Sequence, residues 1–217
     1  GDYYDNALKQ GFDTDFEKGS KAEAVYLKLR SNLWHFGAAK QYTQNREILS
    51  SFIAPLEEIP FKDFKDTADT ILSNYNDNYL KTEWRTAVAN SQSARDWGYL
   101  MEDETIEYIE YITQEDGLVR PAHAKLNGAR YKKSDPFWDL YFPPNDYNCR
   151  CFTTNHDNDT KKKVVKDPPN VGDIGFPQSF AVNSGKKKII FPNSHPYFRV
   201  AKGDKIFRES NYGLPII

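Results

Sequence analysis

The 217-residue sequence predicts an α+β fold, in which N-terminal helices precede a small antiparallel sheet and an irregular C-terminal tail. Apolar residues recur at helical spacing up to about Leu100 and alternate with polar residues from Ile106 onward, and Pro and Gly interrupt the chain after His156. We therefore expect three parts: an N-terminal helical region (1–78), a compact module (79–155), and a linker with a C-terminal extension (156–217).

The longest predicted helix begins after Ser20. Ser20 and Glu23 fit a capping box, in which the hydroxyl and the carboxylate each accept a hydrogen bond from a free backbone N–H group. The apolar positions that follow at helical spacing are Val25, Leu29, Leu33 and Phe36. This pattern extends to about Leu49, and Pro55 and Pro60 end it because proline does not fit inside a helix.

Two further helices are expected between Phe61 and Leu100, and their apolar faces are expected to form the core. The first face consists of Phe61, Phe64, Ala68, Ile71, Leu72 and Tyr75. The second face, on a helix from about Tyr79, consists of Leu80, Trp84, Ala87, Val88, Ser91 and Ala94. Asn and Asp are frequent between them, so we predict a turn at Asn74–Asn78.

The sequence "IEYIEYIT", which begins at Ile106, alternates as a strand does. The turn-forming residues 114–117 follow it, so we predict a β-hairpin whose second strand contains Leu118 and Val119. A short helix is expected from Pro121 to about Gly128, because proline suits the first helical position. Two more short strands are predicted in "CRCFTT" and in "KKKIIFP".

The segment "DPFWDLYFPPNDYNCRC", residues 135–151, combines large aromatic side chains with Pro143–Pro144 and both cysteines of the chain. Proline fixes backbone dihedral angles and the aromatic rings supply apolar area. We expect this segment to fold over the hairpin as a plug and to bring Cys149 and Cys151 next to His123.

The two thiols lie two residues apart, a spacing at which an unstrained disulfide is difficult but one metal ion can be shared. His123 is the natural third ligand, and zinc needs about four. The candidates for the fourth ligand are His156, Asp135 and Asp139. The alternative is that both cysteines are small buried hydrophobic residues.

Composition excludes several classes of function. The net charge of −2 provides no overall basic field for nucleic acid, and no apolar run is long enough to span a membrane. A chain of this length with only two cysteines is not a disulfide scaffold, which fits a protein from a reducing compartment. The chain starts at Gly1 and its single Met is Met101, so we expect it to be part of a longer protein.

No nucleophile motif or nucleotide-binding loop is present in the sequence. Lysines cluster at 132–133, 161–163 and 186–188, each beside polar or turn residues. We interpret them as solvated loops, and the alternative is contact with DNA phosphates or an acidic protein surface.

Three stretches together resemble the phage Mu F-like head-morphogenesis (minor capsid) family: "EWRTAVANSQSARDW", "YIEYITQEDGLVRPAHAKLNG" and "DPFWDLYFPPNDYNCRC". They lie within about Tyr79 to Phe152 and occur in the order seen in that family. "GFPQSFAVNSG" and "IIFPNSHPYF" resemble segments that follow in some members. The positions that carry the motifs are Arg85, Arg120, Pro121, Gly128, Trp138, Pro143, Pro144 and Asn148.

The resemblance implies a structural protein present in few copies inside a tailed-phage capsid, made in the host cytoplasm and acting in head assembly or genome delivery. Its implied partners are the portal, other head proteins and packaged DNA, with no membrane, small-molecule substrate or catalytic residue. The alternatives are a phage-associated enzyme or toxin, of nuclease or ADP-ribosyltransferase type, and a DNA-contacting virion protein.

Many members of this family carry a CxxC pair where this chain has Arg120–His123, followed by the same CRC, and those members offer four zinc ligands. Here only His123, Cys149 and Cys151 match. We therefore favour a centre without a metal, in which Arg120 donates to nearby carbonyls or carboxylates. Zinc is the metal expected if one is bound.

Overall fold

A computed structural model describes residues 2–12, 15–51, 60–157, 174–200 and 204–210. The α-helices are α1 (Asp2–Gly11), α2 (Lys21–Ser50), α3 (Phe61–Ser73), α4 (Leu80–Glu102), α5 (Pro121–Ala124), α6 (Trp138–Tyr141), α8 (Ser184–Lys187) and α9 (Lys205–Glu209). The remaining elements are the π-helix η1 (Asn74–Tyr79), the 3₁₀ turns η2 (Gln178–Phe180) and η3 (Pro196–Phe198), and the strands β1 (Tyr108–Ile112), β2 (Arg130–Lys132) and β3 (Phe152–His156). The predicted α+β class, with helices before a small antiparallel sheet, is confirmed.

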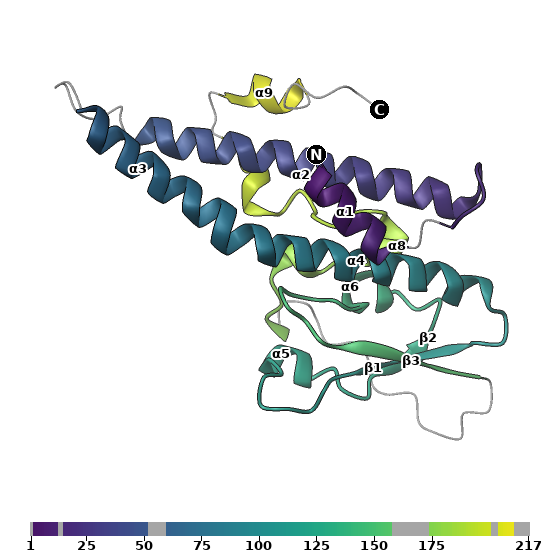
Figure 1. Cartoon of the computed structure of the whole chain (residues 1–217). Helices are drawn as coiled ribbons and strands as arrows, with labels where there is room; N and C mark the ends of the chain where they lie inside the picture. The colour runs from purple at the N-terminus through teal and green to yellow at the C-terminus, as the bar shows by residue number, and fades with distance from the viewer. Residues whose placement is uncertain (1, 13–14, 52–59, 158–173, 201–203, 211–217) are drawn as a thin grey trace.

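The long helices form an upper layer and the sheet forms a lower one, and α4 lies between them (Figure 1). Helix α2 begins as predicted, because Ser20 Oγ accepts a hydrogen bond from Glu23 N at 3.2 Å. The Glu23 carboxylate accepts from Gly19 N, one residue earlier than a capping box requires. The helix ends at Ser50, and Pro55 lies outside the described residues.

The turn predicted at Asn74–Asn78 is wrong, because α3, η1 and α4 follow one another without a break. Residues Asn74–Tyr79 widen into a π-helix. Lys40 Nζ donates to the Tyr75 carbonyl at 2.8 Å, and the Tyr75 ring is buried. Asn and Asp favour turns only weakly, and these tertiary contacts outweigh that preference.

The upper layer has an apolar core that we call the helical core. Its buried members are Tyr4, Ala7, Leu8, Phe12, Tyr26, Leu29, Leu33, Phe36, Ala39, Ala87, Ala94, Ile190, Phe191 and Phe198. The rings of Phe36 and Phe191 stack with centroids 3.7 Å apart. This contact joins α2 to a segment near the C-terminus, so the helical core includes residues from both ends of the chain.

The apolar face predicted for α3 is only partly buried. Ala68, Ile71 and Tyr75 are buried, whereas Phe61, Phe64 and Leu72 are exposed, with 77% of Phe61 accessible. The prediction that all six residues face the core is therefore wrong for these three. The reason is visible in Figure 1, where α3 and the end of α2 extend beyond the other layers, which therefore do not cover this part of α3.

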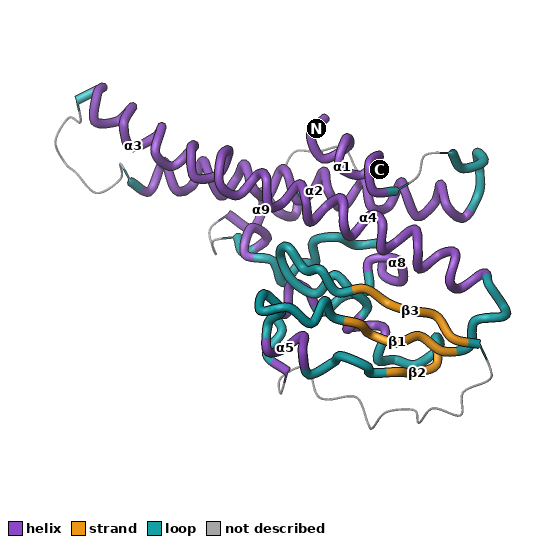
Figure 2. Tube along the Cα trace, turned by 60° about the horizontal axis from the view of Figure 1, so that its bottom comes forward, coloured by secondary structure: helices purple, strands orange, loops and turns teal. Residues whose placement is uncertain are grey.

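The sheet has the strand order β2–β1–β3 and is antiparallel throughout (Figure 2). The predicted hairpin with Leu118 and Val119 is wrong, since β1 pairs with 130–132 and 152–156, and Leu118 is 78% exposed. Asp116 instead closes a local turn, because its carboxylate accepts from Leu118 N and its carbonyl from Val119 N. The strand predicted in "CRCFTT" begins only at Phe152.

The face of the sheet toward α4 carries a second apolar core, which we call the sheet core. Its buried members are Trp97, Leu100, Ile109, Tyr111, Leu126, Ala129, Tyr131, Phe137, Trp138, Tyr141, Phe142, Ile174 and Phe176. Helix α4, strand β1 and the aromatic segment 135–151 thus pack together. Ile174 and Phe176, which follow the predicted module in the sequence, belong to the same core.

No strand forms at "KKKIIFP", and that prediction is wrong. Lys186 and Lys187 belong to α8, and Lys188 adopts a left-handed conformation with φ of +58°. The N–H groups of Ile190 and Phe191 both donate to Asn32 Oδ1 at 2.9 Å, so a side chain on α2 takes the place of a neighbouring strand.

The C-terminal segment has little regular structure, as predicted, but residues 174–200 are packed rather than loose. They contribute Ile174 and Phe176 to the sheet core and Ile190 and Phe191 to the helical core. Residues 158–173, with the lysines at 161–163, lie outside the described part of the chain. No described helix is both long and apolar enough to cross a membrane.

Candidate metal centre

His123 is positioned by α5, which is attached to the central strand. Pro121 occupies the first turn of α5, and His123 N donates to Arg120 O at 2.9 Å. After the helix the chain turns at Gly128, whose φ of +75° favours glycine, and Gly128 N donates to Tyr111 O at 2.8 Å. This bond fixes the helix and its histidine next to β1.

The segment that carries the thiols is held by Pro143 and Asn145. Ser93 Oγ, on α4, donates to Pro143 O at 2.6 Å, and the peptide bond between Pro143 and Pro144 is cis. Asn145 is fully buried and its amide donates to the carbonyls of Leu140 and Phe180. The residue that follows the two prolines, Asn145, is therefore fixed in place by these hydrogen bonds.

Asn148 turns the chain so that both thiols face His123. Its φ of +54° lies in the left-handed region, which Asn tolerates better than most residues. Cys149 N donates to Asp146 O at 3.2 Å, which closes the turn. Both cysteine side chains are half-buried.

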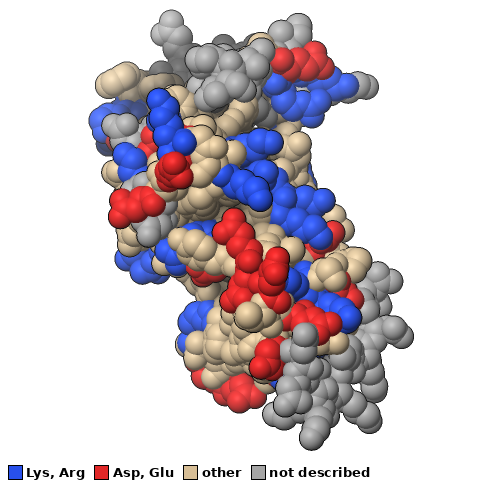
Figure 3. Space-filling view, turned by 90° about the vertical axis from the view of Figure 1, so that its right-hand side faces the viewer, with Lys and Arg blue, Asp and Glu red and all other residues tan. Residues whose placement is uncertain are grey.

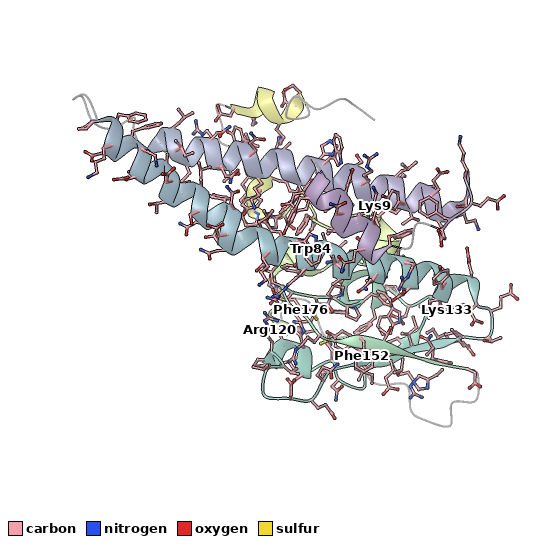
Figure 4. The ribbon with its side chains drawn as sticks, in the orientation of Figure 1. Lys9, Trp84, Arg120, Lys133, Phe152 and Phe176 are labelled. Carbon is pink, nitrogen blue, oxygen red and sulfur yellow. The ribbon has the colours of Figure 1, made fainter. Side chains whose placement is uncertain are left out.

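The predicted convergence of His123, Cys149 and Cys151 is present in the structure. His123 Nδ1 lies 3.4 Å from Cys151 Sγ and 3.5 Å from Cys149 Sγ. One potential ligand atom from each residue lies within 4.8 Å of the others. In Figure 4, Arg120 and Phe176 mark this end of the molecule, beside α5.

The electrostatics of the site are dominated by the two thiols. A hydrogen bond between them, followed by the contact with His123, lowers the pKa of Cys149, while the same neighbour and burial raise the pKa of Cys151. The two thiols are therefore inequivalent, and the proton leaves Cys149 more readily than Cys151.

Arg120 donates to the Tyr147 carbonyl at 2.9 Å and pairs with the Asp146 carboxylate at 3.0 Å. The sequence predicted that Arg120 would donate to a nearby carbonyl or carboxylate, and it donates to one of each. The guanidinium therefore braces the loop that carries the thiols, and Asp146 already partners its charge.

The three candidates for a fourth ligand have other partners. His156 contacts Glu110 at 2.9 Å, Asp139 pairs with Lys186, and the Asp135 carboxylate accepts from Phe137 N at 2.8 Å. Within the described part of the chain, the group of potential ligands contains only the histidine and the two cysteines.

Of two other motif positions, Trp138 has a clear role and Arg85 does not. Trp138 is fully buried in the sheet core and its Nε1 donates to Lys132 O at 3.0 Å. Arg85 lies on the exposed side of α4 and belongs to neither core. Its contribution to the motif has no explanation in this structure.

Sequence reasoning missed two residues that complete the site. Tyr111, fully buried in β1, donates its hydroxyl proton to Asn145 Oδ1 at 3.2 Å and also lies within hydrogen-bonding reach of Cys151. The alternation of β1 could have indicated that Tyr111 faces inward. The position of Asn145 directly after Pro143–Pro144 could have indicated that its side chain is buried.

Comparison with known proteins finds a match that includes the residues of this site. The family model described as "Phage Mu protein F like protein" matches residues 16–154, which is more than half of the chain. The chain belongs to this family. The match begins well before Tyr79, so it includes α2, α3 and the whole helical layer that they form with α4.

Two curated relatives match shorter regions. The "Mu-like prophage FluMu F protein" of Haemophilus influenzae is 34% identical over 73 residues, which are 33% of this chain and 18% of that protein. The "Putative capsid assembly protein F" of Escherichia phage Mu is 43% identical over 44 residues, which are 20% of this chain and 10% of that protein. The chain thus matches less than a fifth of either Mu F-like relative. No solved structure is significantly similar to it.

Proposed function

We propose that this Mu F-like chain is part of a minor capsid protein that acts in phage head assembly or genome delivery through structural contacts. The observation that carries the proposal is membership of a family in which a relative is named a capsid assembly protein. The partners we propose are the portal and other head proteins, and the location is the capsid interior, reached after synthesis in the host cytoplasm.

An exposed apolar surface supports an interaction role. The end of α2 and the start of α3 extend beyond the other layers (Figure 1). Leu49, near the end of α2, is 57% accessible, and Phe61, at the start of α3, is 77% accessible and stacks on the exposed ring of Phe64. Exposed apolar side chains that lie together often mark protein contact sites. We propose that another head protein covers this surface.

Three lysines of the predicted clusters give less support to a DNA-contacting role, because they already have partners within the chain. Lys132 pairs with Glu107, Lys186 pairs with Asp139, and Lys133 donates to the carbonyls of Leu100 and Asp103. Acidic and basic side chains also lie next to one another on the face shown in Figure 3. Both observations favour a protein partner over a phosphate backbone.

The test uses the complete gene in its own phage or prophage. We expect deletion to reduce the yield of filled heads, and complementation to restore the yield and return the protein to purified particles. Phe61→Asp should fail to complement, because a charge cannot be covered by an apolar partner surface. Leu118→Asp is the matched control, since Leu118 is an equally exposed apolar residue far from α3.

Normal heads in the deletion strain would refute the proposal. So would purified particles that contain no trace of the protein in the complemented strain. Both readouts, electron microscopy of the heads and mass spectrometry of the particles, are independent of any catalytic activity.

One contact favours an enzyme as the second candidate. Cys149 Sγ and His123 Nδ1 are 3.5 Å apart, which is close to the separation of a thiol nucleophile and its base. We nevertheless propose that the purified protein lacks nuclease and NAD-glycohydrolase activity. Turnover that disappears when one acid, base or nucleophile is replaced would support the enzyme instead.

A further inference from the structure

We propose that His123, Cys149 and Cys151 bind one zinc ion. This inference goes beyond the role in head assembly and does not depend on it. It also differs from the metal-free centre that the sequence favours, and the reason is the geometry of the three ligand atoms.

The distances fit a metal centre. With zinc–sulfur bonds of about 2.3 Å and a zinc–nitrogen bond of about 2.0–2.1 Å, a tetrahedral ion holds nitrogen and sulfur about 3.6 Å apart. The observed separations from His123 Nδ1 are 3.4 Å to Cys151 and 3.5 Å to Cys149. Each separation also suits a weak S–H···N hydrogen bond, so the distances must be considered together.

The symmetry of the site distinguishes the two interpretations. An imidazole nitrogen has one lone pair and accepts one S–H group well, so a metal-free site needs only one thiol near Nδ1. Here both sulfur atoms lie at nearly the same distance from that nitrogen. A single ion between the three atoms accounts for both contacts at once.

Charge balance favours a divalent ion. Two thiolates and a neutral imidazole carry a charge of −2, which Zn²⁺ cancels, and burial penalises any charge left over. His123 is only 2% exposed, and both cysteines are half-buried. The positive charge of Arg120 is already paired with Asp146, so it is not free to neutralise the thiolates.

Tyr111 holds the loop that carries the thiols. Its side chain is fully buried, and its hydroxyl donates to Asn145 Oδ1 at 3.2 Å. The Asn145 amide donates in turn to the carbonyls of Leu140 and Phe180. The chain therefore enters the segment with Cys149 and Cys151 from a fixed position beside β1.

The described residues supply three ligands, so the fourth position of the ion is left for solvent or an external ligand. This separates the site from four-cysteine structural sites, which are closed. We therefore expect the ion to strengthen the contact between α5 and the loop 145–151 without requiring another residue of this chain.

The test measures zinc binding to the purified chain. After chelation and reduction, the protein is titrated with zinc chloride in competition with a chromophoric chelator, and cobalt(II) is used as a spectroscopic substitute. We expect one ion per chain, and thiolate-to-cobalt charge-transfer bands that are absent in Cys149→Ser and Cys151→Ser.

Arg150→Gln is the matched control, because Arg150 lies between the two cysteines but is exposed and pairs with Asp116. It should bind zinc as the wild type does. A stoichiometry far below one, or equal zinc affinity in the wild type and in both cysteine variants, would overturn the proposal.

Variants that fold poorly are covered by a second measurement on the wild-type chain. Zinc should raise its melting temperature and a chelator should reverse the rise, because an ion that binds only the folded state stabilises it. The Arg150→Gln protein should show the same rise. A wild-type melting temperature that zinc leaves unchanged would contradict the proposal even if no cysteine variant could be purified.

Discussion

His195 is held as a neutral imidazole beside the helical core. Its Nδ1 accepts a hydrogen bond from Tyr197 N at 3.3 Å, so the proton resides on Nε2, which lies 2.9 Å from the Tyr147 hydroxyl. Burial, with a smaller contribution from Arg199, lowers its pKa to about 4. Protonation of Nδ1 would set one N–H group against another.

This histidine predicts how stability depends on pH. The unfolded chain binds the proton near pH 6.5 and the folded chain only near pH 4, so unfolding takes up a proton between these values. Stability should therefore fall by about 3 kcal/mol as the pH drops from 6.5 to 4. Urea unfolding of the wild type and of His195→Asn, whose oxygen still accepts from Tyr197 N, measures the effect.

The His195→Asn variant loses ring contacts and should be less stable at pH 7, but it cannot titrate. The difference in stability between the two proteins should therefore shrink as the pH falls. Parallel pH profiles would show that His195 does not carry the effect.

At the scale of single residues, the sequence predicted that His123, Cys149 and Cys151 come together, because both thiols lie in one segment and the histidine lies in the short helix that precedes it. It did not predict Tyr111 or Asn145, since their roles depend on which residues fold over them. Nor did it predict His195, whose neutral state results from burial beneath residues from distant parts of the chain.

At the scale of elements, α2 and α4 are joined by a buried ion pair. Lys40 Nζ lies 2.6 Å from Glu83 Oε2, and both side chains are less than 10% exposed. The hydroxyls of Tyr4 and Tyr197 donate to the same carboxylate at 2.8 Å. The pair therefore links α1 and η3 to the two long helices as well.

Glu83→Gln should destabilise the protein by about 3–5 kcal/mol, because it leaves the Lys40 ammonium buried without a counter-charge. The single amide oxygen can accept from only one of the two tyrosines, so the loss combines the unpaired charge with one lost hydrogen bond. The double variant Lys40→Met/Glu83→Gln removes that unpaired charge and should be more stable than Glu83→Gln alone. Chemical unfolding of the wild type, of Lys40→Met, of Glu83→Gln and of the double variant gives the coupling energy between the two side chains. A coupling energy near zero would refute this explanation.

The type of an element could be predicted wherever apolar residues kept one spacing over a long stretch, as they do at helical spacing in α2 and α4. The errors have a common cause. Local turn chemistry at 74–78 was overridden by the contacts of Tyr75, and the true partners of β1 lie beyond α5 in the sequence. Short apolar runs such as "KKKIIFP" fit strand and buried loop equally well, and only the position of Asn32 decides between them.

At the scale of the whole molecule, residues 174–200 complete both cores. Ile174 and Phe176 close the sheet core, and Ile190, Phe191 and Phe198 close the helical core. Gly185 lies so close to Trp97 that an added Cβ would be 2.5 Å from the tryptophan Cβ. The segment is thus an integral part of the fold despite its irregular backbone.

A chain that ends at residue 173 should therefore lose cooperative thermal unfolding and bind a hydrophobic dye. The control is a chain that ends at residue 203, which keeps both cores and loses, among the described residues, peripheral contacts such as those of Asp204 with Tyr42 and Arg46. It should melt within a few degrees of the full chain, since exposed ion pairs contribute about 0–1 kcal/mol. Cooperative melting of the shorter chain would contradict the role given to residues 174–200.

The stacking of Phe191 on Phe36 has a consequence for synthesis on the ribosome. About 150 residues separate the two rings, so at about 5–20 residues per second the face of α2 waits roughly 8–30 s for its partner. This part of the first long helix is thus covered late, although Tyr4 of α1 already contacts the Phe36 ring. During that interval the nascent chain presents an apolar helix to chaperones and to neighbouring nascent chains, and translation pauses before Phe191 should favour aggregation.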